Sequence, residues 1–274
     1  MVPCLARYYF AITRLLSLLP LKPAMAPANP LKTKLTSLLA RTLVTRSARL
    51  AGHKPVASIT FDDFPKNAWT LGGAVLARHG VRGTYYAAGG FCGRTIEGAE
   101  YYDESDLRAL ASAGHEIGCH GFGHQPSPAL TDEDLAADAT RNREFLRPFL
   151  NGDVPQSYAF PFGRVSPRTK RFYSARFKSA RGTHRGVNIG RVDLSQLNVV
   201  SLESRCWNEK TIEADIQRVM HCNGWLIFYT HDVSDAPSRY GSTPAMLNWA
   251  LGRVAAARIE MLPMREALPV ALDL

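Results

Sequence analysis

From residue 56 onward, the sequence alternates short apolar runs with longer segments of helical periodicity. The runs that predict strands are 56–61, 83–88, 115–119, 157–160, 225–229 and 260–264. The segments that predict helices are 66–79, 105–113, one that begins at Thr131, 211–222 and 243–257. This alternation is typical of α/β proteins with a parallel sheet, because a parallel connection needs a crossover, which is usually a helix.

The number of these units favours a closed barrel over an open sheet. About seven or eight strand–helix units fit after residue 55, near the small end of the (β/α) barrel range. The glycine-rich signature of dinucleotide-binding open sheets is absent from the sequence. We therefore expect residues 55–274 to form one distorted (β/α) barrel, preceded by a leader of residues 1–54.

The positive charge of the chain is concentrated in that leader. The sequence has 33 Lys and Arg against 24 Asp and Glu, and a formal net charge of +9. Residues 1–61 hold nine basic residues and no acidic one, so the remaining chain has 24 of each sign. Because the body is neutral, the composition gives no support for a nucleic-acid partner.

The leader carries two patterns that bear on localisation. Residues 31–51 space Leu, Val and Ala at helical intervals among Lys and Arg, which predicts peripheral contact with an anionic membrane surface. The alternatives are a solvated or partner-docked helix and an upstream stretch that is not truly coding. Pro27 after the Ala24–Ala26 segment disfavours signal cleavage, so we expect a cytoplasmic or membrane-surface location rather than secretion.

Ionisable residues, or residues that expose their backbone, follow four of the predicted strands at the point where each strand ends. They are Asp62 and Asp63, then His120 and His124, then Pro161 and Phe162, and finally His231. Chemistry in a (β/α) barrel lies on the loops after the carboxyl ends of the strands. We therefore expect these residues to share one end of the barrel.

Their side chains are those of a catalytic metal centre. One carboxylate and two imidazoles suit Zn²⁺ or a neighbouring divalent metal such as Co²⁺ or Mn²⁺, and leave positions open for water and substrate. A metal held in this way lowers the pKa of its water and favours hydrolysis. The second aspartate is then free for proton transfer.

These residues also carry a resemblance to a known family. Thr60-Phe61-Asp62-Asp63, the His120-x-x-x-His124 pair, the segment 159–163 (AFPFG) and the Leu226-to-His231 ending resemble, in order, the motifs of the polysaccharide deacetylases. This is the carbohydrate esterase family four, which includes chitooligosaccharide and peptidoglycan deacetylases. The resemblance implies a distorted (β/α) barrel, a divalent metal, and removal of acetyl groups from N-acetylated sugars.

The resemblance also assigns roles. It makes Asp62 the general base, His231 the general acid, and Asp63, His120 and His124 the metal ligands. The backbone N–H of Phe162, which follows Pro161, would help to hold the oxyanion. Metal and N–H would then stabilise negative charge where it develops.

Several positions depart from the family pattern or extend it. Phe64 follows the two acids where the family often has Gly, which predicts a bulky ring at the pocket mouth. Ala159 stands where many members have an Arg that steadies the catalytic Asp, and Arg164 or Arg185 is the candidate substitute. Asp193 is the candidate acid that tunes His231. Among the aromatic residues that could line a sugar site is Trp207.

The sequence therefore predicts a metal-dependent hydrolase that removes N-acetyl groups from an N-acetylated sugar or polysaccharide. Two alternatives stay open at this point. The first is a deformylase or deacetylase of a lipid-linked sugar, which the basic leader would suit. The second is a catalytically silent barrel that binds sugar.

Overall fold

Seven parallel strands close into a barrel in the computed structural model, which describes residues 30–273 and their side chains from residue 35. The barrel strands are β2 (Val56–Phe61), β3 (Thr84–Ala87), β6 (Glu116–Cys119), β7 (Ser157–Ala159), β8 (Ser179–Arg185), β10 (Leu197–Ser201) and β11 (Trp225–Thr230). They pair in that order, and β11 closes the ring on β2 from Trp225↔Val56 to Thr230↔Phe61. The short strand β12 (Glu260–Met261) pairs in parallel with the first two residues of β2. The prediction of a distorted barrel of about seven or eight strands is confirmed.

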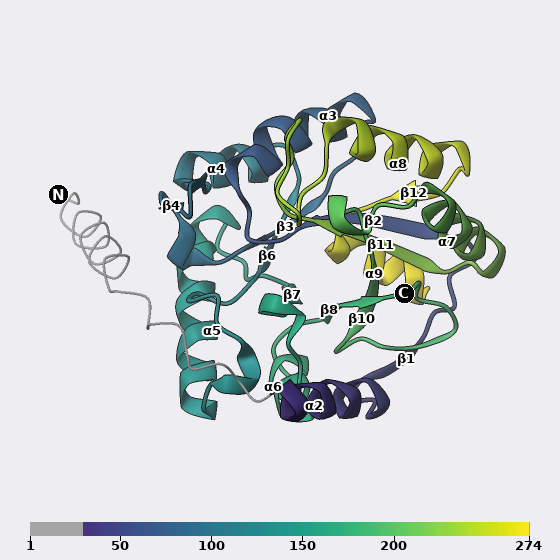
Figure 1. Cartoon of the computed structure of the whole chain (residues 1–274). Coiled ribbons are helices and arrows are strands. Elements are labelled where there is room, and N and C mark those ends of the chain that lie inside the picture. Colours follow the sequence, from purple (N-terminus) through teal and green to yellow (C-terminus); the bar gives the residue numbers. More distant parts are fainter. Residues whose placement is uncertain (1–29, 274) are drawn as a thin grey trace.

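Helices surround this barrel on the outside (Figure 1). The helical elements after the leader are η1 (Ala68–Gly73), α3 (Ala74–Arg78), η2 (Gly89–Phe91), α4 (Glu104–Ser112), η3 (Ser127–Ala129), α5 (Asp132–Leu146), η4 (Arg147–Phe149), η5 (Pro161–Gly163), α6 (Pro167–Ser174), η6 (Ser204–Cys206), α7 (Glu209–Cys222), α8 (Pro244–Ala256) and α9 (Met264–Leu272). Several begin as the sequence predicts. Thr131 caps α5 by accepting the Asp134 N–H, and Thr243 caps α8 by accepting the Met246 N–H.

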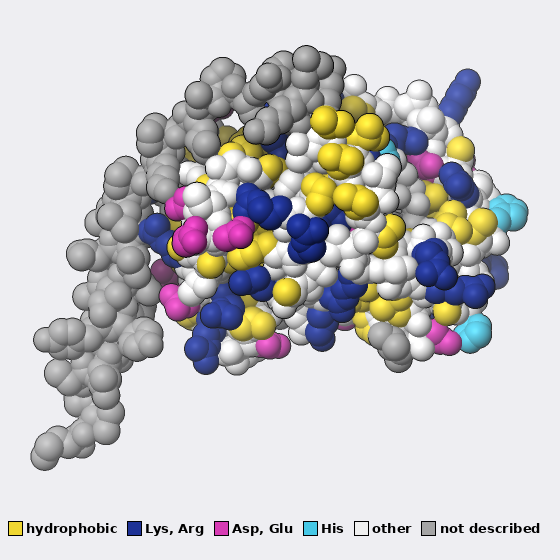
Figure 2. All heavy atoms as spheres, turned by 90° about the horizontal axis from the view of Figure 1, so that it is seen from below, with side chains coloured by type: hydrophobic (Ala, Val, Ile, Leu, Met, Phe, Trp, Pro, Cys, Tyr) yellow, Lys and Arg dark blue, Asp and Glu magenta, His cyan; other side chains and the backbone are white. Residues whose placement is uncertain are grey.

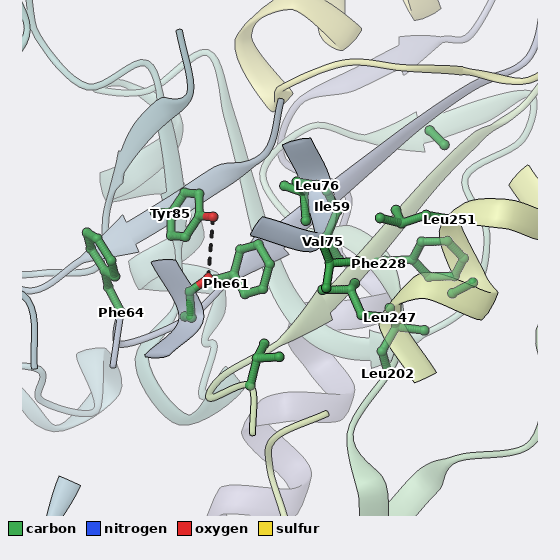
Figure 3. Close-up of a cluster of buried hydrophobic side chains, with 14 of the residues drawn as sticks. Ile59, Phe61, Phe64, Val75, Leu76, Tyr85, Leu202, Phe228, Leu247 and Leu251 are labelled. Carbon is green, nitrogen blue, oxygen red and sulfur yellow. Dashed lines mark hydrogen bonds between the residues drawn. The ribbon is translucent and has the colours of Figure 1, made fainter. Parts of the chain in front are cut away.

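The strands form because their side chains are apolar and can be buried on both faces. Every residue of β2 and β11 is buried. Figure 3 shows how the outer face of these strands packs: Ile59 and Phe228 meet Leu247 and Leu251 of α8. The ring of Phe61 stacks on Tyr85 with the centroids 4.6 Å apart. This packing fixes the two strand ends that carry the first motif and the last one.

Part of the leader lies against the barrel. Helix α2 (Pro30–Thr42) lies beside α6, and β1 (Ser47–Arg49) pairs antiparallel with β9 (Arg191–Asp193) (Figure 1). Residues 1–29 lie outside the described part of the chain. A boundary between a leader of residues 1–54 and a catalytic domain of residues 55–274 stays a prediction.

Two further small features complete the description. Strands β4 (Thr95–Ile96) and β5 (Ala99–Glu100) form a short antiparallel hairpin between η2 and α4. Within residues 30–273 no helix has both the length and the apolar character needed to cross a bilayer.

Candidate active site

The four predicted motifs all follow barrel strands. Asp62 and Asp63 come directly after β2, His120 directly after β6, Phe162 after β7, and His231 directly after β11. Because the barrel strands are parallel, their carboxyl ends open at the same end of the barrel. The structure therefore brings together the residues that the sequence predicted to meet.

Asp63, His120 and His124 converge on one point. The Asp63 Oδ1 atom is 3.1 Å from His120 Nε2 and 2.8 Å from His124 Nε2. One ligand atom from each of the three residues lies within 4.8 Å of the others. The backbone at Asp63 and His124 is left-handed, with φ of 62° and 47°. Asp and His are among the residues that adopt this conformation most readily, so the turns that aim both side chains are accessible to them.

Partners outside the cluster orient the histidines. The Nδ1 atom of His120 is 2.8 Å from the carbonyl oxygen of Ala159, which can only accept, so Nδ1 carries the proton and Nε2 presents a lone pair toward Asp63. The Asp138 carboxylate accepts the N–H groups of Phe122 and Gly123 at 2.9 and 2.7 Å. These bonds fix the loop between the two histidines.

This donor set fits a divalent cation. A carboxylate oxygen and an imidazole lone pair point at each other across 3.1 Å, and no donor hydrogen stands between them in this tautomer of His120. A cation held by all three groups would satisfy these electron pairs. Burial alone would raise the pKa of the Asp63 carboxyl. When the two imidazoles are protonated instead, His124 foremost, they outweigh burial and hold that pKa well below its usual range, and a bound cation would take the place of their protons. The carboxylate is thus the anionic form that a metal needs.

Asp62 has a different environment, dominated by Arg181 of β8. Arg181 is fully buried, and both of its terminal nitrogens donate to the Asp62 carboxylate, one of them at 3.1 Å. Burial would raise the pKa of Asp62, but this guanidinium, together with the imidazoles of His120 and His231, lowers it below the usual value. Asp62 is therefore an ionised carboxylate, and it is not one of the three side chains that converge on the candidate metal site.

Arg181 supplies the guanidinium that the sequence analysis missed. Ala159 of β7 pairs in register with Arg181 of β8, so the arginine comes from the neighbouring strand at the same height in the barrel. Neither expected substitute takes this role: Arg185 pairs with Asp215 at 2.5 Å, and Arg164 only ends the turn η5. The expectation of Arg164 or Arg185 is corrected to Arg181.

His231 is backed by a carboxylate, and that carboxylate belongs to Glu203. The His231 Nδ1 atom is 3.2 Å from the Tyr240 carbonyl oxygen and 3.6 Å from Glu203 Oε1. The other carboxylate oxygen of Glu203 accepts from Arg205 and from the Tyr229 hydroxyl. With Nδ1 directed at these acceptors, Nε2 of His231 is the nitrogen left for chemistry.

Asp193 lies elsewhere and does not face His231. Its carboxylate accepts the backbone N–H groups of Thr45 and Arg46 and lies 2.6 Å from Lys170 Nζ. Asp193 lies in β9 and not at the end of a barrel strand. Its carboxylate therefore binds residues 45 and 46 of the leader instead of His231. The sequence offered one signal for Glu203 instead, which is an acid directly after the apolar run Leu197–Leu202.

Two aromatic expectations are also corrected. Phe64 is fully buried and stacks on Tyr102 with the centroids 4.6 Å apart, so its ring belongs to the core rather than to the pocket mouth. Trp207 packs edge-to-face on Trp249 at 5.5 Å, against the core beside α7 and α8.

The exposed aromatic ring beside the metal ligands is Phe162, which is 60% exposed and lies 4.5 Å from the His124 ring. Phe162 is the second residue of the turn η5 and has a left-handed backbone, with φ of 58°. The N–H groups in the first turn of a helix have no acceptor within it. The Phe162 N–H is therefore a donor that a ligand can use, beside Pro161.

Comparison with known proteins matches this architecture to a family. Residues 49–176 match the family model described as polysaccharide deacetylase. This part of the chain, which holds the residues from β2 to α6, is therefore similar to the polysaccharide deacetylases. A comparison with curated proteins finds no match.

Solved structures share the fold of this chain at low sequence identity. A family 4 acetyl xylan esterase from Clostridium thermocellum, in complex with a cobalt ion, is 18% identical with a TM-score of 0.53, and covers 78% of this chain and 91% of its own. A peptidoglycan N-acetylglucosamine deacetylase is 13% identical with a TM-score of 0.56, covering 85% and 94%. A family 4 pseudoenzyme from Bacillus anthracis is 11% identical with a TM-score of 0.55, covering 81% and 68%.

Proposed function

We propose that this protein is a metal-dependent hydrolase that removes N-acetyl groups from an N-acetylated saccharide. The observation that carries the proposal is the convergence of Asp63, His120 and His124 beside an ionised Asp62 and a carboxylate-backed His231. The match of residues 49–176 to the polysaccharide deacetylase model supports the same reaction.

The three ligand side chains would hold Zn²⁺, Co²⁺ or Mn²⁺ through one oxygen and two nitrogens. When bound, such an ion supplies Lewis acidity toward the acetyl carbonyl and makes water a stronger acid. The protein contributes the geometry, because Ala159 orients His120, and Asp138 fixes the loop that carries His124.

Asp62 is the group suited to accept a proton from the attacking water. It is ionised, and Arg181 holds its carboxylate in one orientation with two hydrogen bonds. A guanidinium suits this task because it cannot itself take up the proton. Asp62 therefore acts as general base, while Arg181 positions it and touches no substrate.

His231 is the group suited to protonate the departing amine. Its Nδ1 faces the Tyr240 carbonyl and the Glu203 carboxylate, so these acceptors orient the ring and leave Nε2 toward the substrate side. The Phe162 N–H would donate a hydrogen bond to the oxygen on which negative charge develops. A base and an acid on separate strands complete the proton transfers of amide hydrolysis.

Two alternative functions predict different products. A deformylase would release formate from an N-formyl sugar, and a silent barrel, like the Bacillus anthracis pseudoenzyme, would release nothing. The presence of all five polar residues argues against a silent barrel, since sugar binding alone needs no metal, base and acid together. We expect metal-loaded protein to release acetate from N-acetylglucosamine oligomers; formate release alone, or no turnover, would reject the proposal.

Substitution of the two adjacent acids tests the assigned roles. Asp62→Asn should retain metal and lower turnover by about 10² to 10⁴, the usual effect of a positioned proton-transfer group. Asp63→Asn should lose metal and activity together, and Asn is well suited to the left-handed backbone there. Elemental analysis and acetate release measure both effects, with Asp153→Asn on an exposed loop before β7 as the matched control. Metal loss in Asp62→Asn with retention in Asp63→Asn would reverse the assignment.

A further inference from the structure

Helix α2 is fixed to the barrel by a buried cation rather than by its leucines. Lys170 of α6 is 1% exposed, and its ammonium group donates to the carbonyls of Ala40 and Leu43 at 2.6 and 2.8 Å. It also lies 2.6 Å from Asp193, which accepts the N–H groups that follow α2. A cation at the carboxyl end of a helix is favourable, and here it fixes that end on the barrel wall.

The leucines from residue 35 onward, in α2 and directly after it, face outward instead. The large apolar side chains of this segment are exposed by 44–59%, and we call them the leucine face: Leu35, Leu38, Leu39, Leu43 and Val44. Ala40 is fully buried on the opposite side. An ordinary surface helix buries its leucine stripe against the core. Positions 35, 39 and 43 recur every four residues, so they form one continuous stripe on the outside of the helix.

Basic side chains surround this face. Arg41 is exposed on α2 and Arg49 on β1, and Arg171, Arg176 and Lys178 are exposed on α6 and the turn after it. Two contacts bring these segments together: α2 packs on α6, and Arg46 donates to the Phe177 carbonyl at 3.0 Å. Figure 2 views the side of the molecule that carries α2, where hydrophobic side chains gather among Lys and Arg.

The charges indicate what covers the leucine face. A second copy would bring the same basic surface against itself, because a two-fold interface pairs identical patches. The chain's own residues 1–29 are also basic, with Arg7, Arg14 and Lys22 and no acid. Neither of these occupants complements the arginines, whereas an anionic lipid surface complements both the leucines and the arginines.

We propose that the leucine face of α2 binds the surface of a membrane that contains anionic phospholipid, with the helix lying along the membrane plane. The leucines enter the boundary between headgroups and acyl chains, and the arginines contact lipid phosphates. The clamp formed by Lys170 and Asp193 keeps the leucines pointing outward from the barrel. This inference does not depend on the proposed enzymatic reaction.

Flotation of the full-length protein with lipid vesicles tests the proposal. We expect binding to phosphatidylcholine vesicles that contain about 30% phosphatidylglycerol, at least about tenfold tighter than to pure phosphatidylcholine, and weakening with added salt. Leu39→Glu should lower this binding by about tenfold or more, because burying one leucine is worth that factor or greater.

Leu71→Glu is the matched control. Leu71 has the same 44% exposure as Leu39 but lies in η1 next to α3, on the side of the molecule away from α2 (Figure 1). Arg41→Gln and Arg171→Gln should each weaken binding by about fivefold, the effect of one basic residue near an anionic surface. Arg78→Gln on α3 is the control for charge and should leave binding unchanged.

Three results would overturn the proposal. Equal binding to neutral and anionic vesicles would remove the charge argument. Concentration-dependent dimers that Leu39→Glu disperses, without vesicle binding, would make the face an interface between copies. Vesicle binding that survives Leu39→Glu but disappears when residues 1–29 are deleted would place the membrane contact outside the leucine face.

Discussion

Arg181 provides the cation that binds Asp62, although it lies outside the sequence motifs that predict the site. The buried carboxylate of Asp62 requires a cation beside it, and the motif position that would carry one is Ala159. The guanidinium enters from β8, where Arg181 pairs in register with Ala159. Neighbouring strands of a barrel hold such pairs about 5 Å apart, so a long side chain can reach the same carboxylate from either strand. A sequence motif on one strand cannot show that the arginine comes from the neighbouring strand.

Replacing Arg181 should impair catalysis without removing the metal. We expect Arg181→Lys to keep the charge but lose the two-pronged geometry, and so to lower turnover by about 10- to 100-fold with unchanged metal content. Arg181→Met should lower turnover further and also destabilise the fold, because it strands a buried carboxylate. Acetate release and elemental analysis on the same samples measure both effects. Loss of metal in Arg181→Lys would show that the arginine shapes the ligand cluster instead.

Glu203 gives a parallel prediction on the acid side of the site. Glu203→Gln keeps the size and the hydrogen bond from Tyr229 but removes the charge 3.6 Å from His231. We expect turnover to fall by about 10-fold or more, with metal content unchanged, because the His231 ring loses the carboxylate that lies against its Nδ1. Asp193→Asn is the informative comparison, since the sequence favoured that acid. An equal loss of turnover in both variants, at equal stability, would remove Glu203 from this role.

Among the elements, the strands with the strongest apolar pattern were predicted and the mixed ones were not. Val56–Phe61 and Trp225–Thr230 are mostly apolar and are buried throughout, so composition alone identifies them. Strand β8 reads SARGTHR, with a buried Arg and Gly in its interior, and looks like a loop. β10 was missed for a related reason, since it is short and interrupted by Asn198. Strand β8 carries Arg181, and β10 ends two residues before Glu203. The sequence analysis missed these two site residues because it missed the strands that position them.

His115, just before β6, makes a prediction about stability and pH. It is buried, accepts the Gly83 N–H through Nδ1 at 2.9 Å, and packs edge-on against Trp69 and Tyr85. Burial, with Arg82 nearby, lowers its pKa from 6.5 to about 4. Between these values the unfolded chain binds a proton that the folded chain excludes. The free energy of unfolding should therefore fall with pH from about 6.5 to 4, by up to about 1.4 kcal/mol per pH unit.

Urea denaturation across this pH range measures the effect. His115→Gln retains an acceptor for the Gly83 N–H but cannot be protonated, so its stability should lack the part of the slope that His115 contributes. His79→Gln, on the outer surface where the ring meets Asn248, is the matched control. Identical slopes for wild type and His115→Gln would contradict the assigned titration.

At the scale of the whole molecule, the leader and the barrel are joined through Lys170 and Asp193. Residues 40–46 contact this pair: the carbonyls of Ala40 and Leu43 accept from the ammonium group, and the N–H groups of Thr45 and Arg46 donate to Asp193. Sequence alone presented residues 1–54 as a detachable basic segment, since no acid or strand–helix alternation occurs before residue 56. A single lysine inside a polar helix gave no sign that its charge would be enclosed.

The contacts of Lys170 with the leader predict how the stability of the protein depends on this lysine with and without the leader. In the full chain, Lys170→Met should lower the free energy of unfolding by about 3 to 5 kcal/mol, because it leaves the Asp193 carboxylate and two helix carbonyls without their cation. In a fragment of residues 55–274, which we expect to fold, the same substitution should cost about 1 kcal/mol or less, since the ammonium would be hydrated and the pair exposed. Urea midpoints of the four proteins measure this difference, with Lys178→Met as the control for an exposed lysine. A loss of equal size in both chain lengths would mean that the barrel alone buries Lys170 and that the leader contributes nothing to the clamp.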